Sequence, residues 1–344
     1  MILRQWWRVA SLLAGLVLPP GLAGAATQPV VIKMATPVPE RSSWFQILKE
    51  MADAWKTASG GRVVLRVYPG GVAGDDVDVV RKMRLGTLQA GVLTAAGLAE
   101  IDPAAHALSL PLMYRGDDEA SAVVERMRPR LDAAFEARGL VILSWIDAGW
   151  IHFFTQKPVA TPDDLRALAL FTLAGDPRMA EVWRSAGFKP VPMPSSEITR
   201  ALDAGRLSAL GCLPQVAAIA RYYHHAKNMT DLPWHLQVGA TVINKTAWDQ
   251  VPAETRPALQ QAAGEAGLRL QADIRNGGPR DVAAMRKRGL NVVAVDARAR
   301  AEWEKLAASL YPKLRGGIVP ADAFDEAMRY RDEYRHRAAV PGRP

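Results

Sequence analysis

The sequence predicts an α/β protein in which short apolar strands alternate with amphipathic helices. The pattern is clearest between Thr161 and Pro214, where three strand-length apolar runs are separated by two helix-length segments. This alternation is typical of consecutive βαβ units, whose strands are parallel and whose crossovers are right-handed. The three runs are Ala167 to Phe171, Lys189 to Met193, and Leu207 to Leu213.

Helix boundary signals in the same stretch support this order. Asp176, followed by a proline, is expected to begin the first helix. The second helix is expected to be capped by Ser195 or Ser196 and to end at Gly205. The residues of the first helix that we expect in the core are Met179, Val182 and Trp183.

A ligand site is expected where these strands end. Parallel sheets bind their ligands beyond the carboxyl ends of the strands, because the intervening loops meet at that edge. The predicted strand ends are Phe171–Thr172, Met193–Ser196 and Cys212–Gln215.

Residues 1–26 have the features of a secretory signal peptide. Arg4 and Arg8 precede an apolar run from Val9 to Leu18, and small residues around Ala25 offer a cleavage site. The run is too short to cross a bilayer, and no later segment has the length of apolar residues that a span needs. We therefore expect an exported protein from which these residues are removed.

The chain between Val30 and Trp145 repeats the alternation of strands and helices. A helix begun by Ser43 and Gln46 as a capping box carries an apolar stripe that predicts core packing, although Trp44 in its first turn could reach a cleft. Another helix begins at Asp75, and a small-residue loop is expected at Thr94–Gly97. The stripe consists of Trp44, Leu48, Met51 and Trp55, and the expected strands are Val30–Met34, Val63–Val67, Leu88–Thr94 and Leu140–Trp145.

Two strands are expected to cross between the two halves of the molecule, at Trp150–Thr155 and Gln237–Asn244. Two crossings permit closure on a ligand by hinge bending. Trp248–Ile274 predicts a long amphipathic helix, which Gly277–Pro279 would break. A strand at Asn291–Asp296 and helices at Ala297–Leu310 and Pro320–Arg337 are expected to complete the chain.

Composition and motifs argue against several function classes. The net charge is +8, from 43 Lys and Arg against 35 Asp and Glu, but the excess is scattered and does not predict a nucleic-acid interface. Cys212 is the only cysteine, which excludes a disulfide framework. Adjacent His224 and His225 point to different sides and make a poor chelating pair. No nucleophile motif is present, so we expect neither an enzyme nor a bound metal or cofactor.

The block from Thr161 to Pro214 resembles the core of the extracytoplasmic solute-binding subunits of TRAP (tripartite ATP-independent periplasmic) transporters, DctP type. The likeness extends from about Val31 to Val295. The matching features are, in order, Gly60–Val63, Gly70–Gly74, Leu110–Tyr114, Thr161–Leu165, Gly187, Pro190–Pro194, Ser196–Glu197, Ala201–Leu202 and Gly205.

The resemblance implies the two-lobed periplasmic binding protein fold, an α/β fold in which each lobe is a mixed sheet with flanking helices and a long helix spans both lobes. It divides the chain into lobe I at 27–148, lobe II at 149–240 with hinge strands at its edges, and a remainder at 241–344. This remainder holds the spanning helix, a returning strand and the last helices. It also implies a periplasmic protein that closes on one small molecule and delivers it to integral-membrane transporter subunits.

One departure from the family pattern guides the prediction of the ligand. The family usually ends the strand after Asp164-Leu165 with an arginine that clamps a carboxylate, and the matching position here is Phe171. Enclosing an unpaired carboxylate costs several kcal/mol, whereas burying about 200 Å² of apolar surface contributes roughly 5 kcal/mol. We therefore expect a hydrophobic or amphiphilic ligand. The expected ligand-binding residues are Phe171, Trp150, Cys212, Ser195, Thr172, Gln215, Trp44 and Thr94.

Three alternatives stay open. Phe171 and Trp150 could be core residues, since aromatic side chains are often buried. The ligand could instead be a dicarboxylate or sugar acid, as is usual in the family, with Arg178 as a displaced clamp. The protein could also be a lipid-handling or receptor subunit of a system other than the TRAP type, which the neighbouring genes would reveal.

Overall fold

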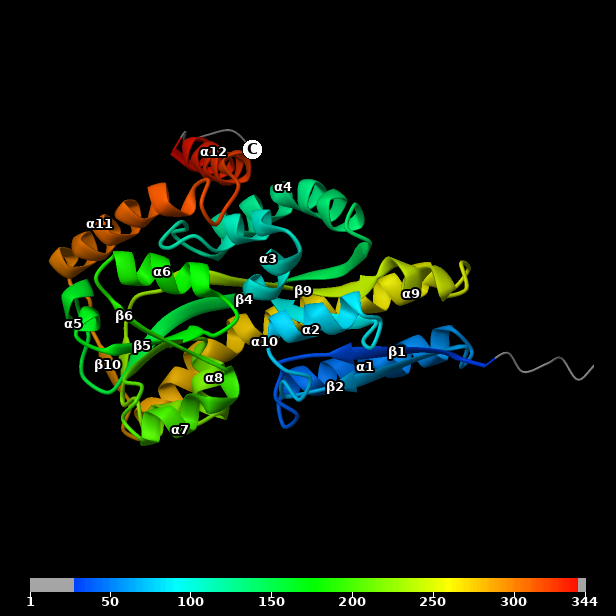
Figure 1. Ribbon diagram of the computed structural model, residues 1–344, viewed down its shortest axis with the longest axis horizontal. Coiled ribbons are helices and arrows are strands. Elements are labelled where there is room, and N and C mark those ends of the chain that lie inside the picture. Colours follow the sequence, from blue (N-terminus) through cyan, green and yellow to red (C-terminus); the bar gives the residue numbers. More distant parts are fainter. Residues whose placement is uncertain (1–27, 340–344) are drawn as a thin grey trace, which may run out of the picture.

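The computed structural model describes residues 28–339, so the predicted signal peptide lies outside the described residues. Strands and helices alternate along most of this chain (Figure 1). The strands are β1 (Val30–Ala35), β2 (Val63–Tyr68), β3 (Ala90–Thr94), β4 (Leu140–Thr155), β5 (Ala169–Leu173), β6 (Lys189–Met193), β7 (Ala209–Cys212), β8 (Asn228–Thr230), β9 (His235–Asn244) and β10 (Asn291–Val293). The α-helices are α1 (Ser43–Ala58), α2 (Asp76–Arg84), α3 (Ala95–Ile101), α4 (Asp117–Glu136), α5 (Pro162–Arg166), α6 (Pro177–Ser185), α7 (Ile198–Asp203), α8 (Pro214–Ile219), α9 (Lys245–Gln250), α10 (Arg256–Arg286), α11 (Ala297–Leu314) and α12 (Ala321–Ala339). Short 3₁₀ helices are η1 (Pro103–Ser109), η2 (Ser195–Glu197) and η3 (Tyr222–His224).

Two sets of parallel strands flank a central antiparallel pair. The strand order is β2-β1-β3-β9-β4-β7-β5-β6, and β8 pairs with both β4 and β10. Strands β1, β2 and β3 are parallel, as are β5, β6 and β7, whereas β9 and β4 run antiparallel to their neighbours on this path. We call the half around β1 to β3 the first lobe and the half around β5 to β7 the second lobe. The predicted α/β fold with parallel strands after Thr161 is confirmed.

Strand β4 passes from one lobe to the other. Its first part pairs with β9, and His152–Thr155 then pairs with β7. The pairing with β9 slips between Asp147 and Trp150, where Gly149 has a φ of 79°. Buried Asp147 forms an ion pair with Arg275 of α10, with 2.5 Å between carboxylate oxygen and guanidinium nitrogen. The two short strands that we predicted here therefore form one strand with an irregularity.

Helix α10 contacts both lobes, through α1 in the first and α8 in the second, as expected for the spanning helix (Figure 1). The prediction that Gly277–Pro279 breaks this helix is wrong, because it continues to Arg286. Gly277 faces Gln215 of α8, and a Cβ atom there would lie 2.1 Å from the amide nitrogen of Gln215. This glycine therefore permits a close contact between two elements and does not end the helix.

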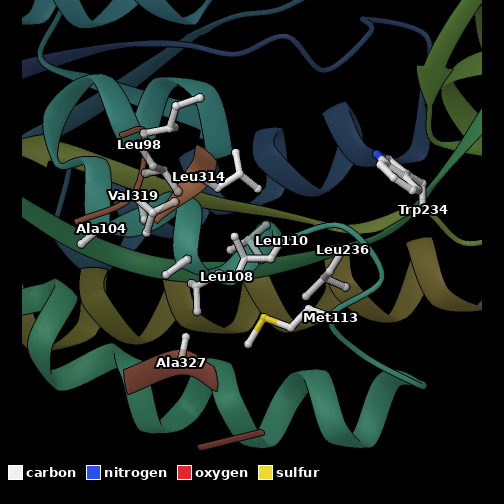
Figure 2. Packing of buried hydrophobic residues seen from close by; sticks show 14 of the residues in the cluster. Leu98, Ala104, Leu108, Leu110, Met113, Trp234, Leu236, Leu314, Val319 and Ala327 are labelled. Atoms are coloured by element: carbon white, nitrogen blue, oxygen red, sulfur yellow. The ribbon is translucent and has the colours of Figure 1, made fainter. Parts of the chain in front are cut away.

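The largest core cluster joins the two lobes. It combines side chains of the first lobe with side chains of the second, such as Leu170 and Phe188, and with those of β9, α11 and α12, and Figure 2 shows part of it. A second cluster packs α1 against β1, β2 and α10 and contains the whole predicted stripe of α1. The residues that Figure 2 labels are Leu98, Ala104, Leu108, Leu110, Met113, Trp234, Leu236, Leu314, Val319 and Ala327.

Local signals were correct for some helix ends and wrong for others. Asp176 caps α6 as predicted, since its carboxylate accepts a hydrogen bond of 3.0 Å from the backbone N–H of Met179. Ser42, one residue before the predicted capping box, caps α1. Ser195 does not cap α7, and the predicted loop after Thr94 is helix α3, whose small residues fit closely against α2.

Candidate functional site

An inner cavity lies between the lobes, with a volume of about 240 Å³. The first lobe contributes the end of β3, the start of α3, and η1 to its wall. The second lobe contributes β5 and α6, and strands β4 and β9 cross its base. The lining residues are Thr94, Ala95, Ala96, His106, Ser109, Leu110, Pro111, Ile151, Phe153, Leu170, Phe171, Thr172, Leu173, Asp176, Met179, Val182, Trp183, Gly211, Trp234, His235, Gln237, Leu310, Leu314, Ile318 and Val319. Most of this wall is apolar.

An outer cavity of about 340 Å³ adjoins the inner one. The two share Ala96 and His106 from the first lobe and Leu173 and Asp176 from the second, so these four residues mark the passage between them. The other residues that line the outer cavity are Asp75, Asp76, Val77, Ala99, Glu100, Gly175, Pro177 and Arg178. The outer wall is therefore rich in charge.

Arg178 is the only Lys or Arg that lines either cavity within residues 28–339. It is exposed and has no carboxylate of the described chain within 4.0 Å. The acidic side chains of the outer cavity are all engaged by other groups. Asp75 accepts hydrogen bonds from Ser195, and Asp76 accepts hydrogen bonds from Thr94. Glu100 accepts one from Arg84, and Asp176 accepts one from the backbone N–H of Met179. The guanidinium of Arg178 is thus the charged group of this wall that makes no hydrogen bond or ion pair within the described chain, and it shares the wall with four carboxylates.

The two histidines of the inner cavity add no positive charge at neutral pH. Burial lowers the pKa of His235 to about 4, and it also lowers the pKa of His106. Nearby Asp176 opposes the shift in the pKa of His106, while Arg178 adds to it. The Nδ1 atom of His235 lies 3.1 Å from the carbonyl oxygen of Leu236, so Nδ1–H is the donor and Nε2 remains as an acceptor.

The contact between Asp75 and Ser195 joins the lobes at the mouth of the outer cavity. The carboxylate of Asp75, before α2, accepts hydrogen bonds from the hydroxyl and from the backbone N–H of Ser195, the latter at 3.2 Å. Beside it, a Cβ atom on Gly175 would lie 2.7 Å from Val77. The two lobes therefore touch here, as they would around an enclosed ligand.

Four of the sequence-predicted residues line the cavities. Phe171, Thr172 and Thr94 line the inner cavity, and Arg178 lines the outer one. Phe171 is half-buried and also packs against the core cluster of the second lobe. The carboxyl end of β5 thus lies at the cavity, as the parallel-sheet rule predicts.

The structure does not place Trp150, Cys212, Gln215 or Trp44 on either wall. The indole N–H of Trp150 donates to Asp117 at 2.7 Å, and the ring packs against the main core cluster and the ring of Tyr114. Cys212 is buried in the second-lobe core, where burial raises its thiol pKa. The side-chain amide of Gln215 donates to the backbone carbonyl of Asp273. Trp44 is buried in the core cluster that packs α1 against β1, β2 and α10. Ser195 lies beside the outer cavity through its contact with Asp75.

Several lining residues carried no sequence signal for the cavity. His106, Ser109 and Trp234 lie in short or irregular segments that we had not assigned to a binding role. The last turns of α11 and the loop after it also reach the wall, through Leu314 and Val319. Among the lining residues that we had not predicted to bind a ligand, Asp176 did have a signal, as the predicted helix cap. Among the described residues, no three His, Cys, Asp or Glu side chains gather as metal ligands, and no helix is long and apolar enough to cross a bilayer.

Two α/β lobes joined by crossing strands, with a cavity between them, are the arrangement expected of a two-lobed solute-binding protein. A match to the profile of the DctP family, described as bacterial extracellular solute-binding protein, family 7, covers residues 34–316. The chain belongs to this family, and the resemblance to TRAP solute-binding subunits is confirmed.

Individual relatives are distant in sequence but similar in fold. The chain is 27% identical over 216 residues to a solute-binding protein of Chromohalobacter salexigens, which covers 62% of this chain and just under two thirds (63%) of that protein. It is 24% identical over 247 residues to the 2,3-diketo-L-gulonate-binding periplasmic protein YiaO of Escherichia coli, covering 71% of this chain and 75% of that protein. The crystal structure of a TRAP periplasmic solute binding protein from Ralstonia eutropha with bound (S)-2-acetolactate gives a TM-score of 0.82 at 23% identity, over 88% of this chain and 99% of that chain.

Proposed function

We propose that the protein is a periplasmic receptor that binds a small organic acid and delivers it to TRAP membrane subunits. The relatives support this proposal over the hydrophobic ligand that we preferred from the sequence. One is named for a sugar acid, and a solved structure of the same fold holds a hydroxy-oxo acid. The family also supports export, although the predicted signal peptide at 1–26 lies outside the described residues.

The observation that carries the proposal is the position of Arg178. It is the single cationic side chain on the walls of the two cavities among the described residues, and no carboxylate of that part of the chain lies within 4.0 Å of it. An arginine binds a carboxylate through two parallel hydrogen bonds, which suits it to the role of a clamp. That Phe171 replaces the arginine usual in the family stays a prediction, and Arg178 would take over its role from the start of α6.

The apolar inner wall indicates what the rest of the acid is like. Phe171, Met179 and Trp183 line a cavity that no Lys or Arg of the described chain enters. A ligand with its carboxylate at the outer cavity would therefore place an apolar body inside, where burial contributes about 25 cal/mol per Å². The same wall favours a second candidate, a neutral hydrophobic ligand that makes no use of Arg178.

A thermal-shift and calorimetry screen of the mature protein separates these candidates. The panel contains dicarboxylates, sugar acids, short branched acids and the neutral amides of those acids. Under our proposal at least one acid stabilises the protein, by about 2.7 kcal/mol at a concentration 100 times its Kd, and its amide does not. Stabilisation by the amides equal to that by the acids would reject the proposal in favour of the neutral ligand.

Substitutions locate the carboxylate. Arg178→Gln should abolish acid binding, whereas Phe171→Ala should retain the preference for the acid over its amide. Arg184→Gln is the matched control, because Arg184 lies on the same helix, pairs with Glu181 and lines neither cavity. Unchanged acid binding in Arg178→Gln would show that the clamp lies elsewhere.

A further inference from the structure

We infer that Ser109 and Thr172 determine specificity, because their hydroxyls hold an uncharged polar group of the acid inside the inner cavity. The inference rests on the proposed organic-acid function and defines the part of the ligand that lies beyond the carboxylate. The two residues come from different lobes. Ser109 ends η1 in the first lobe, and Thr172 lies on β5 in the second.

Both residues line the inner cavity, and both hydroxyls are buried without a hydrogen-bond partner in the described chain. Thr172 is only 7% exposed. Its backbone is fixed by the β5–β6 ladder, opposite Pro192, so the position of the side chain is set by the sheet. A buried hydroxyl that makes no hydrogen bond is destabilising, and folded proteins contain few of them.

Two other buried threonines of the described chain are hydrogen-bonded through their hydroxyls. The hydroxyl of Thr230 donates to the carbonyl of Val159 at 2.9 Å, and that of Thr155 donates to the carbonyl of Lys157 at 2.7 Å. Neither of these two residues lines a cavity. Buried hydroxyls without a partner also occur at Tyr114 and Ser144, which line neither cavity. Those of Ser109 and Thr172 are the ones at a place where a ligand would supply the missing partner.

The chemistry of the inner cavity indicates an uncharged partner. Within residues 28–339 no Lys or Arg lines it, and burial keeps His235 neutral at neutral pH. The amide nitrogen of Gln237 and the hydroxyl of Thr94 already donate to Val238 and Asp76. A second carboxylate would have no cation to meet, whereas a hydroxyl or carbonyl oxygen matches two free hydroxyls. Because these hydroxyls lie on different lobes, a ligand that joins them also favours the closed state.

The test uses 3-methylbutanoate and its 2-hydroxy and 3-hydroxy derivatives, measured by calorimetry on the mature protein. At least one hydroxy acid should bind about tenfold more tightly than the parent acid. Thr172→Val and Ser109→Ala should each reduce that preference, and the double variant should remove it. Thr172→Ser, which keeps the hydroxyl, should retain most of it.

Stability of the free protein supplies a measurement that a structural role would not reproduce. Thr172→Val keeps the side-chain shape and removes an unsatisfied hydroxyl, so the thermal midpoint should stay the same or rise. Thr230→Val, the matched control, loses a hydrogen bond and should lower the midpoint.

The two proposals fail in different ways. If acids bind but the hydroxy derivatives gain nothing, or if Thr172→Val lowers the midpoint as much as Thr230→Val does, the inference about the hydroxyls is overturned and the organic-acid function stands. If no acid binds at all, the proposed function is wrong and the inference is rejected with it.

Discussion

The inner and outer cavities meet at His106 and Asp176 but differ in how their walls are held. Phe153 and Trp234 of the inner wall belong to the main core, where Trp234 packs against Phe153 and Trp183. The wall of the outer cavity is polar and includes contacts between the lobes, of which Asp75 with Ser195 is the clearest. The wall of the inner cavity is therefore part of the core that stabilises the fold. The outer cavity, in contrast, depends on closure of the two lobes.

The strongest test of this comparison removes an aromatic side chain from the inner wall. Trp234→Ala should lower the free energy of unfolding by about 3–5 kcal/mol, because the indole is only 2% exposed and packs against both Phe153 and Trp303. Urea denaturation of the free protein measures the loss. Phe171→Ala is the control on the same wall, and its loss should be smaller because Phe171 is half-buried. A loss below 1 kcal/mol for Trp234→Ala would show that the inner wall is not part of the core.

Lowering the pH should destabilise the protein through the buried histidines of the inner cavity. His235 has an ordinary pKa of 6.5 in the unfolded chain and a pKa of about 4 in the folded one, because burial disfavours its charged form. The unfolded state therefore binds more protons between these values, and stability falls as the pH decreases from about 6.5 to 4. For His235 alone the loss is of the order of 2 kcal/mol at pH 5, and His106 adds to it in the same direction.

Urea denaturation at pH 7.5 and pH 5 tests this prediction. His235→Gln cannot be protonated, so it should lose less stability between the two pH values than the natural protein does. Equal losses in both proteins would show that other groups cause the acid sensitivity.

The sequence predicted those parts of the site that depend on local order. The end of β5 and the cap at Asp176 follow from an apolar run and a capping residue, and both lie at the cavity. Trp150 and Cys212 do not line the cavity, because successive side chains of a strand point to opposite faces and their neighbours Ile151 and Gly211 line it instead. Cys212 accordingly packs in the core, while its neighbour Gly211 lines the cavity.

Contacts between distant segments carried no such signal. His106 and Trp234 belong to segments far apart in the chain and line the same cavity only in the folded protein. The spanning helix shows the same limit, since Gly277 and Pro279 suggested a break while the contact with Gln215 explains the glycine. Pair contacts of this kind depend on the tertiary fold, which a linear pattern does not describe.

The smallest expected effect concerns closure at the outer cavity. Asp75→Asn should weaken the contact with Ser195, because a neutral amide oxygen is a poorer acceptor than a carboxylate. The contact is exposed, so the closed state should lose only about 1 kcal/mol, and ligand affinity should fall about fivefold. The unfolding free energy should stay within about 0.5 kcal/mol of the natural value, in contrast to Trp234→Ala.

Asp78→Asn is the matched control, since Asp78 lies on α2, pairs with Arg81 and lines neither cavity. Small-angle scattering of the free and ligand-bound protein would detect a more open average shape in Asp75→Asn, and an unchanged shape and affinity would remove this contact from the account of closure.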